Sequence, residues 1–206
     1  MRGRSLSAIA TEVGFPIPVD IRRAKGWAGQ LLEVALGAES GSLAEPDFRQ
    51  LGVELKSIPV DALGRPSEST YVCTAPMDGS AGFDWEGSWV RRKLSTVLWM
   101  PVLGATDSPG QRCLGGPLLW RPSDDETAEI RADWEHFAEA VALGELWQLH
   151  GRNGKVLQIR PKAASSSEWG WAVDTEGGWV QKTPIGFYLK TKFTRKIFSN
   201  AGRFVE

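Results

Sequence analysis

Hydrophobic residues recur along the chain with two different spacings, which predict helices in some segments and strands in others. A spacing of three or four positions predicts helices over residues 5–13 and 27–36. Gly37 follows the second of these, in the position where a glycine commonly ends a helix. The side chains of this helix that we expect to face the core are Trp27, Leu31 and Val34.

A longer helix is predicted to begin after Ser123. Ser123 and Glu126 form an S-x-x-E capping box, and the acidic residues of the first turn suit the positive end of the helix dipole. Apolar residues then recur with helical spacing at Ile130, Trp134, Phe137 and Val141. We expect this stripe to pack against the core and the acidic side chains to face solvent.

Alternating and continuous apolar runs predict short strands between these helices. Their approximate ranges are 53–58, 69–75, 95–101, 117–120, 155–162 and 185–189. A basic helix over 191–198 is predicted to follow the last strand. Strands interleaved with helices favour an α/β (or α+β) fold, with a mixed central sheet flanked by helices.

The strand predicted over 53–58 carries the best candidates for chemistry. Side chains alternate faces along a strand, so Glu54 and Lys56 point to the same side. Asp47 precedes Glu54 by seven residues, and the segment 48–52 is long enough to return Asp47 beside Glu54. Neighbouring carboxylates repel each other and favour a divalent cation between them, and oxygen ligands of this kind suit Mg²⁺.

Lys56 completes the motif P-D-x6-E-x-K, which begins at Pro46. A lysine beside a bound cation can orient or deprotonate a water molecule, or balance charge on a phosphate. The motif is therefore typical of a centre that hydrolyses phosphodiesters. A motif this short also arises by chance, and Glu54 and Lys56 could instead be charge partners on a solvent-exposed sheet face.

Charge is unevenly distributed along the 206 residues, although the formal net charge is only −1. Between Asp124 and Glu145, eight acidic residues accompany a single base, Arg131. From Gly177 to the end of the chain the balance is basic. A basic end of this kind could bind a polyanion, and a solvated tail would have the same composition.

The sequence contains no pattern that predicts a membrane span or secretion. No apolar run approaches the ~18 residues that a membrane span requires, and the first residues lack the continuous apolar region of a signal peptide. Cys73 and Cys113 are too few for a disulfide framework or a cysteine metal site. These features predict a cytoplasmic protein.

Segments throughout the chain resemble the MutH family, strand-discriminating endonucleases of DNA mismatch repair that are related to type II restriction enzymes. The segments are Lys25–Trp27, Gln30–Glu33, Leu36–Ala38, Pro46–Phe48, Leu51–Lys56, Val90–Leu94, Gly116–Trp120, Leu157–Ala164 and Gly186–Lys190. Because they follow one another in the family's order over nearly the whole chain, this resemblance is far more specific than the metal-binding motif alone.

The resemblance implies a fold and an activity. The fold would be that of restriction endonucleases, a single domain over residues 1–206 with two sub-lobes that form a DNA cleft. The activity would be Mg²⁺-dependent nicking of the unmethylated strand of double-stranded DNA at hemimethylated GATC sites, with Mn²⁺ able to substitute and one or two ions acting. The implied partner is MutL, an ATP-dependent activator recruited by the mismatch sensor MutS, and the enzyme itself is expected to be a monomer.

The resemblance also implies roles for individual residues. Asp47 and Glu54 would bind the metal, assisted by Glu33 and by the Leu55 carbonyl. Without the resemblance, Glu33 would be interpreted as an exposed helical glutamate. Lys56 would position the attacking water and stabilise the developing charge. The residues implied to contact DNA are Arg160 and Lys162 at base edges, Tyr188 at the adenine methyl group, Lys93 at a phosphate, and Lys25, Glu68 and Tyr71.

Two other functions fit parts of the sequence. A GATC-specific type II restriction endonuclease would share these motifs and would cut both strands without an activator. A non-catalytic binding module is a different class, either a sugar-binding domain that uses exposed tryptophans or an inactive DNA-binding relative. The presence of Asp47, Glu54 and Lys56 together argues against the inactive relative. Trp169-Gly170-Trp171, in the Ser/Trp-rich segment 165–171, is a candidate contact surface without an assigned role.

Overall fold

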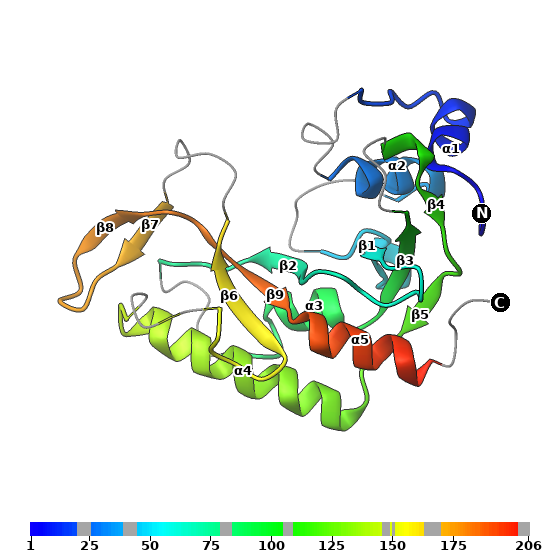
Figure 1. Ribbon diagram of the computed structural model, residues 1–206. Coiled ribbons are helices and arrows are strands. Elements are labelled where there is room, and N and C mark those ends of the chain that lie inside the picture. The colour runs from blue at the N-terminus through cyan, green and yellow to red at the C-terminus, as the bar shows by residue number, and fades with distance from the viewer. Residues whose placement is uncertain are drawn as a thin grey trace. The chain divides into compact units, whose positions relative to one another are not determined.

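The computed structural model describes residues 1–19, 26–38, 45–78, 84–104, 109–145, 149, 151–162 and 170–201 (Figure 1). The chain divides into two compact units. Unit 1 comprises Met1–Glu68, Ser95–Arg121 and Thr194–Glu206, and unit 2 comprises Ser69–Leu94 and Pro122–Phe193. Among the described residues, no helix has the length and apolar character needed to cross a membrane.

Unit 1 is built around a mixed four-stranded sheet. Its elements are α1 (Leu6–Glu12), α2 (Trp27–Leu36), the 3-10 turn η2 (Arg49–Leu51), β1 (Glu54–Val60), β3 (Val97–Leu103), the 3-10 turn η3 (Pro109–Gln111), β4 (Cys113–Leu114), β5 (Leu118–Trp120) and most of α5 (Thr191–Asn200). β1 runs parallel to β3 with Lys56 opposite Trp99, whereas β4 and β5 pair antiparallel with β3.

Helices cover both faces of this sheet (Figure 1). On one face, α1 and α2 bury their apolar side chains against Leu55 and Met100. On the other face, Phe198 of α5 packs edge-on against Trp99, with ring centroids 5.8 Å apart. Because side chains alternate along a strand, Glu54 and Lys56 lie on the face opposite Leu55, as the sequence predicts.

The predicted core stripe of α2 is wrong at one position. Val34 is exposed to solvent, whereas Trp27, Leu31 and Leu32 are buried in the core of unit 1. Leu32 and the partly buried Ala35 continue the face that Leu31 begins, so the buried face is rotated about the helix axis away from Val34, a shift that helical spacing alone does not determine.

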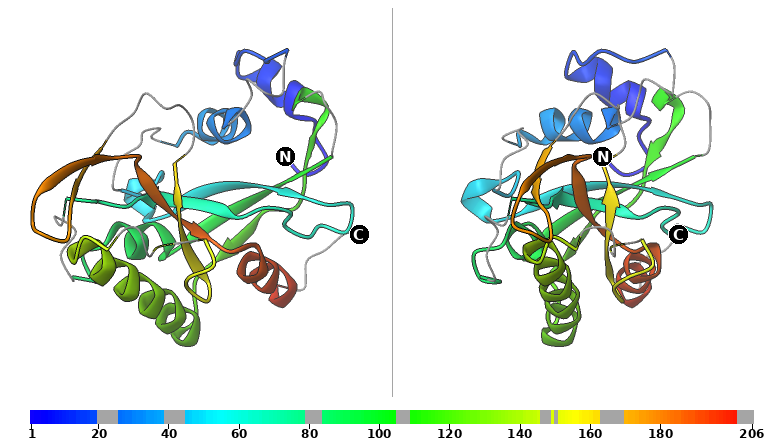
Figure 2. Two further views of the ribbon diagram at one scale, coloured as in Figure 1. Left: turned by 60° about the vertical axis from the view of Figure 1, so that its left-hand side comes forward. Right: turned by 90° about the vertical axis from the view of Figure 1, so that its left-hand side faces the viewer.

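Unit 2 combines a three-stranded antiparallel sheet, in the order β2-β9-β6, with a separate hairpin, β7–β8. Its elements are β2 (Thr70–Thr74), α3 (Trp89–Leu94), α4 (Asp124–Ala142), β6 (Leu157–Pro161), β7 (Gly170–Val173), β8 (Trp179–Lys182) and β9 (Ile185–Leu189). α4 packs on one face of the sheet, where the rings of Phe137 and Phe187 lie 6.3 Å apart (Figures 1 and 2). A mixed sheet flanked by helices, as predicted, is thus confirmed for the chain.

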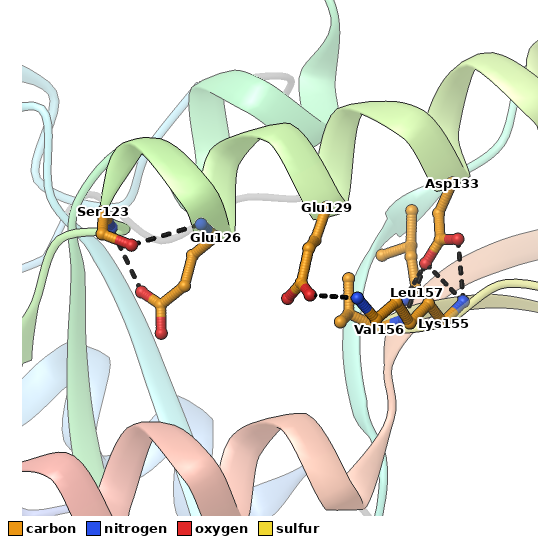
Figure 3. Close-up of polar contacts among 7 residues, drawn as sticks. All are labelled: Ser123, Glu126, Glu129, Asp133, Lys155, Val156 and Leu157. Carbon is orange, nitrogen blue, oxygen red and sulfur yellow. Dashed lines mark hydrogen bonds and ion pairs between the residues drawn. The ribbon is translucent and has the colours of Figure 1, made fainter.

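The long helix α4 begins as predicted, with both hydrogen bonds of the capping box formed (Figure 3). Ser123 Oγ accepts from the backbone N–H of Glu126 at 3.2 Å, and Glu126 Oε2 accepts from that of Ser123 at 3.1 Å. The predicted apolar stripe is buried. The expectation that all the acidic residues face solvent is wrong for Glu126, which the capping box holds, and for Asp133.

Asp133 is buried because its carboxylate holds the start of β6 (Figure 3). It accepts hydrogen bonds from the backbone N–H groups of Lys155, Val156 and Leu157, at 2.7 to 2.8 Å. Lys155 also extends its ammonium group to Glu129, one helical turn before Asp133. Together these contacts fasten β6, and with it the residues that follow in the strand, to the long helix.

Candidate metal centre and nucleic-acid interface

The chain turns back on itself between Asp47 and Glu54. The 3-10 turn η2 ends at Gly52, whose φ of 63° is a left-handed conformation that glycine adopts without steric cost. Phe48 and Val53 close the turn with two backbone hydrogen bonds, of 2.9 and 3.3 Å. The Asp47 carboxylate then accepts from the backbone N–H of Leu55 at 2.8 Å. The turn therefore returns Asp47 to the start of β1, next to Glu54.

Glu54 and Lys56 form a close ion pair at this position. Lys56 Nζ lies 2.5 Å from Glu54 Oε1, and the lysine side chain is mostly buried. Glu54 is 1% exposed and Asp47 is 7% exposed. The alternative interpretation, in which Glu54 and Lys56 are charge partners on a solvent-exposed sheet face, is therefore wrong. Burying an ion costs several kcal/mol even after the protein relaxes. Buried charges of this kind are therefore more frequent at functional sites than on ordinary sheet surfaces. We call Asp47, Glu54 and Lys56 the carboxylate–lysine site.

Glu33 lies half-buried on α2. It follows Gly29 by one helical turn, and a Cβ added at Gly29 would lie 3.5 Å from Ser57 Oγ, so this side of α2 faces β1. Among the described residues, no three Asp, Glu, His or Cys side chains gather closely enough to hold a metal ion. Of the predicted ligand set, the structure therefore brings Asp47 and Glu54 to one end of β1, and the contributions of Glu33 and the Leu55 carbonyl stay predictions.

A second group of predicted residues gathers on the three-stranded sheet of unit 2. Tyr71 and Tyr188 lie opposite each other on β2 and β9, with ring centroids 5.3 Å apart and ring planes at 67°. The Arg160 guanidinium lies 5.8 Å from the centroid of Tyr188, and Lys162 Nζ lies 5.7 Å from that of Tyr71. These distances are within the range of cation–π attraction. We call these four residues the tyrosine–cation face.

Two residues that the sequence does not single out shape this face. Ser69 Oγ accepts a hydrogen bond from Arg160 Nη1 at 2.9 Å. A Cβ at Gly186 would lie 2.9 Å from Cε2 of Tyr71, so position 186 must be glycine for the ring to keep its place. The signal for Gly186 is its place two residues before Tyr188, on the same strand face. Ser69 has no local signal, because its partner lies 91 residues along the chain.

Burial moves the pKa of Tyr188 further above neutral pH. Its partly buried position raises the pKa of the phenol above the ordinary 10.0, and the neighbouring Tyr71 adds to this shift. The positive charges of Arg160 and Lys162 act in the opposite direction. The Tyr188 hydroxyl is therefore protonated at neutral pH and retains a hydrogen to donate.

The remaining residues predicted to contact DNA lie elsewhere. Lys93 is buried at the end of α3, and Glu68 is exposed just before β2. Lys25 lies outside the described residues. Part of the basic C-terminal segment also serves the fold, because Lys190 donates to the carbonyls of Arg152 and Gly154, at 3.1 and 2.6 Å. The positive charge of that segment is thus not one continuous exposed surface.

The chain is similar over nearly its whole length to proteins named DNA mismatch repair protein MutH. It is 48% identical over 196 residues to that of Vibrio cholerae serotype O1 (strain M66-2), an alignment that covers 95% of this chain and 89% of the relative. It is also 48% identical over 200 residues to that of Klebsiella pneumoniae (strain 342), covering 97% and 87%, and to that of Shewanella baltica (strain OS223), covering 97% and 90%.

A family model described as DNA mismatch repair enzyme MutH matches residues 36–133, a range that includes the carboxylate–lysine site. The matched range extends from the end of α2 through β1 and β3 into α4. The relatives extend the similarity to both units, and hence to the tyrosine–cation face. The resemblance noted from the sequence is thereby confirmed, and the chain belongs to the MutH family of DNA mismatch repair enzymes.

Proposed function

We propose that this protein is a Mg²⁺-dependent endonuclease that nicks the unmethylated strand of DNA at hemimethylated GATC sites during mismatch repair. The observation that carries the proposal is the carboxylate–lysine site, in which two buried carboxylates and a lysine meet at the start of β1. Membership of the MutH family supplies the DNA repair context. We further expect a monomer that acts in the cytoplasm and is activated by MutL once MutS has found a mismatch.

Asp47 and Glu54 are the residues that would hold the metal ion, with Glu33 and the Leu55 carbonyl as supporting ligands. Both carboxylates are more than nine-tenths buried, and they supply the hard oxygen donors that Mg²⁺ prefers. The bound cation would supply electrostatic stabilisation for the charge that develops on the phosphate. Mn²⁺ prefers similar oxygen ligands and is expected to substitute, with one or two ions acting.

Lys56 is proposed to act on the phosphate and on the attacking water. Its ion pair with Glu54 holds the ammonium group at the edge of the carboxylate–lysine site. The lysine side chain therefore loses little conformational freedom when DNA binds. An ammonium group has three hydrogens, so Lys56 can donate to a phosphate oxygen or to the water while it keeps its bond to Glu54. A fixed positive charge there would stabilise the negative charge that builds up as the phosphodiester is attacked.

The tyrosine–cation face is proposed to read the DNA sequence. The guanidinium of Arg160 is exposed beyond its contact with Ser69, and its fork matches the O6 and N7 acceptors of guanine in the major groove. Lys162 would contact a neighbouring base edge. Tyr188, with a protonated hydroxyl, would lie at the adenine and sense whether its amino group is methylated. Tyr71, packed against Tyr188, would keep the sensing ring in position.

Replacing Arg160 by methionine is expected to weaken binding to a GATC duplex by about 10- to 100-fold, because a good base contact is worth ~1–3 kcal/mol. The matched control is Arg152→Met, another exposed arginine of unit 2. Fluorescence anisotropy at fixed salt, with Ca²⁺ in place of Mg²⁺, would measure both variants on duplexes with and without GATC. Equal weakening of Arg160→Met on both duplexes would assign Arg160 to the DNA backbone and contradict its role in base reading.

The activity itself is tested on duplexes that carry one GATC site in hemimethylated or fully methylated form. With Mg²⁺, ATP and MutL, we expect a nick in the unmethylated strand of the first and none in the second. Efficient double-strand breaks without any activator would instead support the restriction-endonuclease alternative. No cleavage of either duplex, with MutL present, would reject the proposed function.

A further inference from the structure

The outer face of the β7–β8 hairpin in unit 2 carries two strongly exposed tryptophans. Trp171 is 57% exposed and Trp179 is 60% exposed. The strand register pairs Val173 with Trp179 and Trp171 with Gln181, so the two indoles are diagonal neighbours on one face. Ala172, on the opposite face, is completely buried. Figures 1 and 2 show the hairpin extending beyond the three-stranded sheet of the same unit.

Asp78 lies beside these two rings. The backbone N–H of Val173 donates to the carbonyl of Met77 at 3.2 Å, which holds this segment along the edge of β7. Asp78, the next residue, lines a shallow cavity of about 440 Å³ together with Trp171 and Trp179. Among the described residues, the lining of the cavity is therefore two tryptophans and one exposed aspartate.

This combination favours a planar cation. The face of an indole ring attracts positive charge, and tryptophan does so more strongly than tyrosine or phenylalanine. A guanidinium group can stack on an indole while its N–H groups reach a carboxylate, which a compact ammonium group does less well. Arginine and tryptophan are also the residue types most often found at energetically important positions of protein interfaces.

The charged residues of the hairpin also favour a cationic ligand. Its acidic residues are Asp174, which accepts hydrogen bonds within the turn, and Glu176, which is exposed. Lys182 is the only basic residue between Gly170 and Lys182, and strand alternation places it on the face opposite the two tryptophans. With Asp78 added, the hairpin and the described lining of the cavity carry three acidic residues against one basic residue, a balance that attracts a cationic side chain and repels the phosphates of a nucleic acid.

We propose that the pocket formed by Asp78, Trp171 and Trp179 binds an arginine side chain presented by a partner protein. The guanidinium stacks against the indoles and pairs with the Asp78 carboxylate, and the aliphatic part of the arginine covers apolar ring surface that is otherwise in water. None of the described residues that line this pocket belongs to the carboxylate–lysine site or to the tyrosine–cation face. It is therefore a separate docking point on this chain.

The test follows the indole N–H signals of the ¹⁵N-labelled full-length protein by NMR. Trp171→Phe and Trp179→Phe variants assign the two signals. N-acetyl-arginine methylamide is expected to shift both signals saturably, and the citrulline derivative, which has the same shape without the charge, to shift them little. Trp89, a partly exposed tryptophan of α3, is the internal control and is expected not to respond.

Asp78→Asn removes the carboxylate's charge and is expected to weaken arginine binding about two- to fivefold, the usual effect of an exposed ion pair. Equal shifts from arginine and citrulline would overturn the proposal, and this comparison needs only the unaltered protein. Shifts of Trp171 and Trp179 caused by maltose or a single-stranded oligonucleotide, without a response to arginine, would also overturn it and would assign the pocket to a sugar or to DNA.

Discussion

Replacing Glu54 by glutamine or Lys56 by methionine is expected to abolish nicking while DNA binding is largely kept. Glutamine fills the same space as glutamate but lacks the negative charge that holds a divalent cation, and methionine keeps the apolar stem of lysine without the ammonium group. Loss of one group that stabilises developing charge costs about 10²–10³-fold in rate. For Glu54→Gln we expect at least this loss of rate. The substitution removes a carboxylate that binds the cation, so the stabilisation that the cation gives to the developing charge is reduced as well. Single-turnover nicking measures the rate, and anisotropy with Ca²⁺ measures binding.

The buried ion pair between Glu54 and Lys56 determines the controls for this experiment. Removing one member of such a pair leaves a buried charge uncompensated and can cost about 3–5 kcal/mol of stability. The double variant Glu54→Gln/Lys56→Met removes both charges and separates loss of catalysis from loss of folding. Glu12→Gln, an exposed carboxylate of unit 1, is the matched control and is expected to nick normally. A folded double variant that nicks at the normal rate would show that the site is not the catalytic centre.

Asp133→Asn is expected to lower the free energy of unfolding by about 1.5–3 kcal/mol, because three backbone N–H groups lose a charged acceptor and the new amide N–H₂ group would face the N–H of Lys155. Oδ2 of Asp133 accepts from the N–H groups of Lys155, Val156 and Leu157, and Oδ1 shares the N–H of Lys155, whereas asparagine keeps a single, uncharged oxygen. Urea denaturation gives the free energy of unfolding. Amide hydrogen exchange at Lys155, Val156 and Leu157 gives the local effect, and these amides should lose protection first.

Glu139→Gln is the control for Asp133→Asn, because it removes an exposed acid from the same helix. Exposed substitutions of this kind usually change stability by no more than ~0.5 kcal/mol. If Asp133→Asn and Glu139→Gln had equal stability, and the amides at the start of β6 kept their protection, the carboxylate of Asp133 would not be what fastens β6 to α4.

The spacing of apolar residues within a segment predicts those helices that pack against the core with one face. The bounds of α2 and the stripe of α4 follow from helical periodicity, because one face of each helix lies against the core. Local spacing does not predict β4, of two residues, or the four-residue strands of the β7–β8 hairpin, which are too short to show alternation. The buried Asp133 is not predicted either, since its partners are backbone N–H groups 22 to 24 residues away.

The same distinction holds for the candidate sites. The carboxylate–lysine site could be predicted because it is contained in a turn and the strand that follows, where Gly52 permits the turn and strand alternation aligns Glu54 with Lys56. The tyrosine–cation face depends on the pairing of three strands that are distant in sequence, so only the family resemblance indicated it. The pocket beside the hairpin depends on the contact between Met77 and Val173, for which the sequence carries no signal.

The central claim, that Asp47 and Glu54 hold the catalytic cation, is tested most directly by counting bound Mn²⁺ with electron paramagnetic resonance. The samples are complexes of the unaltered protein, Asp47→Asn and Glu54→Gln with a fully methylated GATC duplex, which is expected to stay uncut. We expect at least one bound Mn²⁺ in the first complex, and weaker or absent binding in both variants. Equal Mn²⁺ binding by all three complexes would contradict the claim.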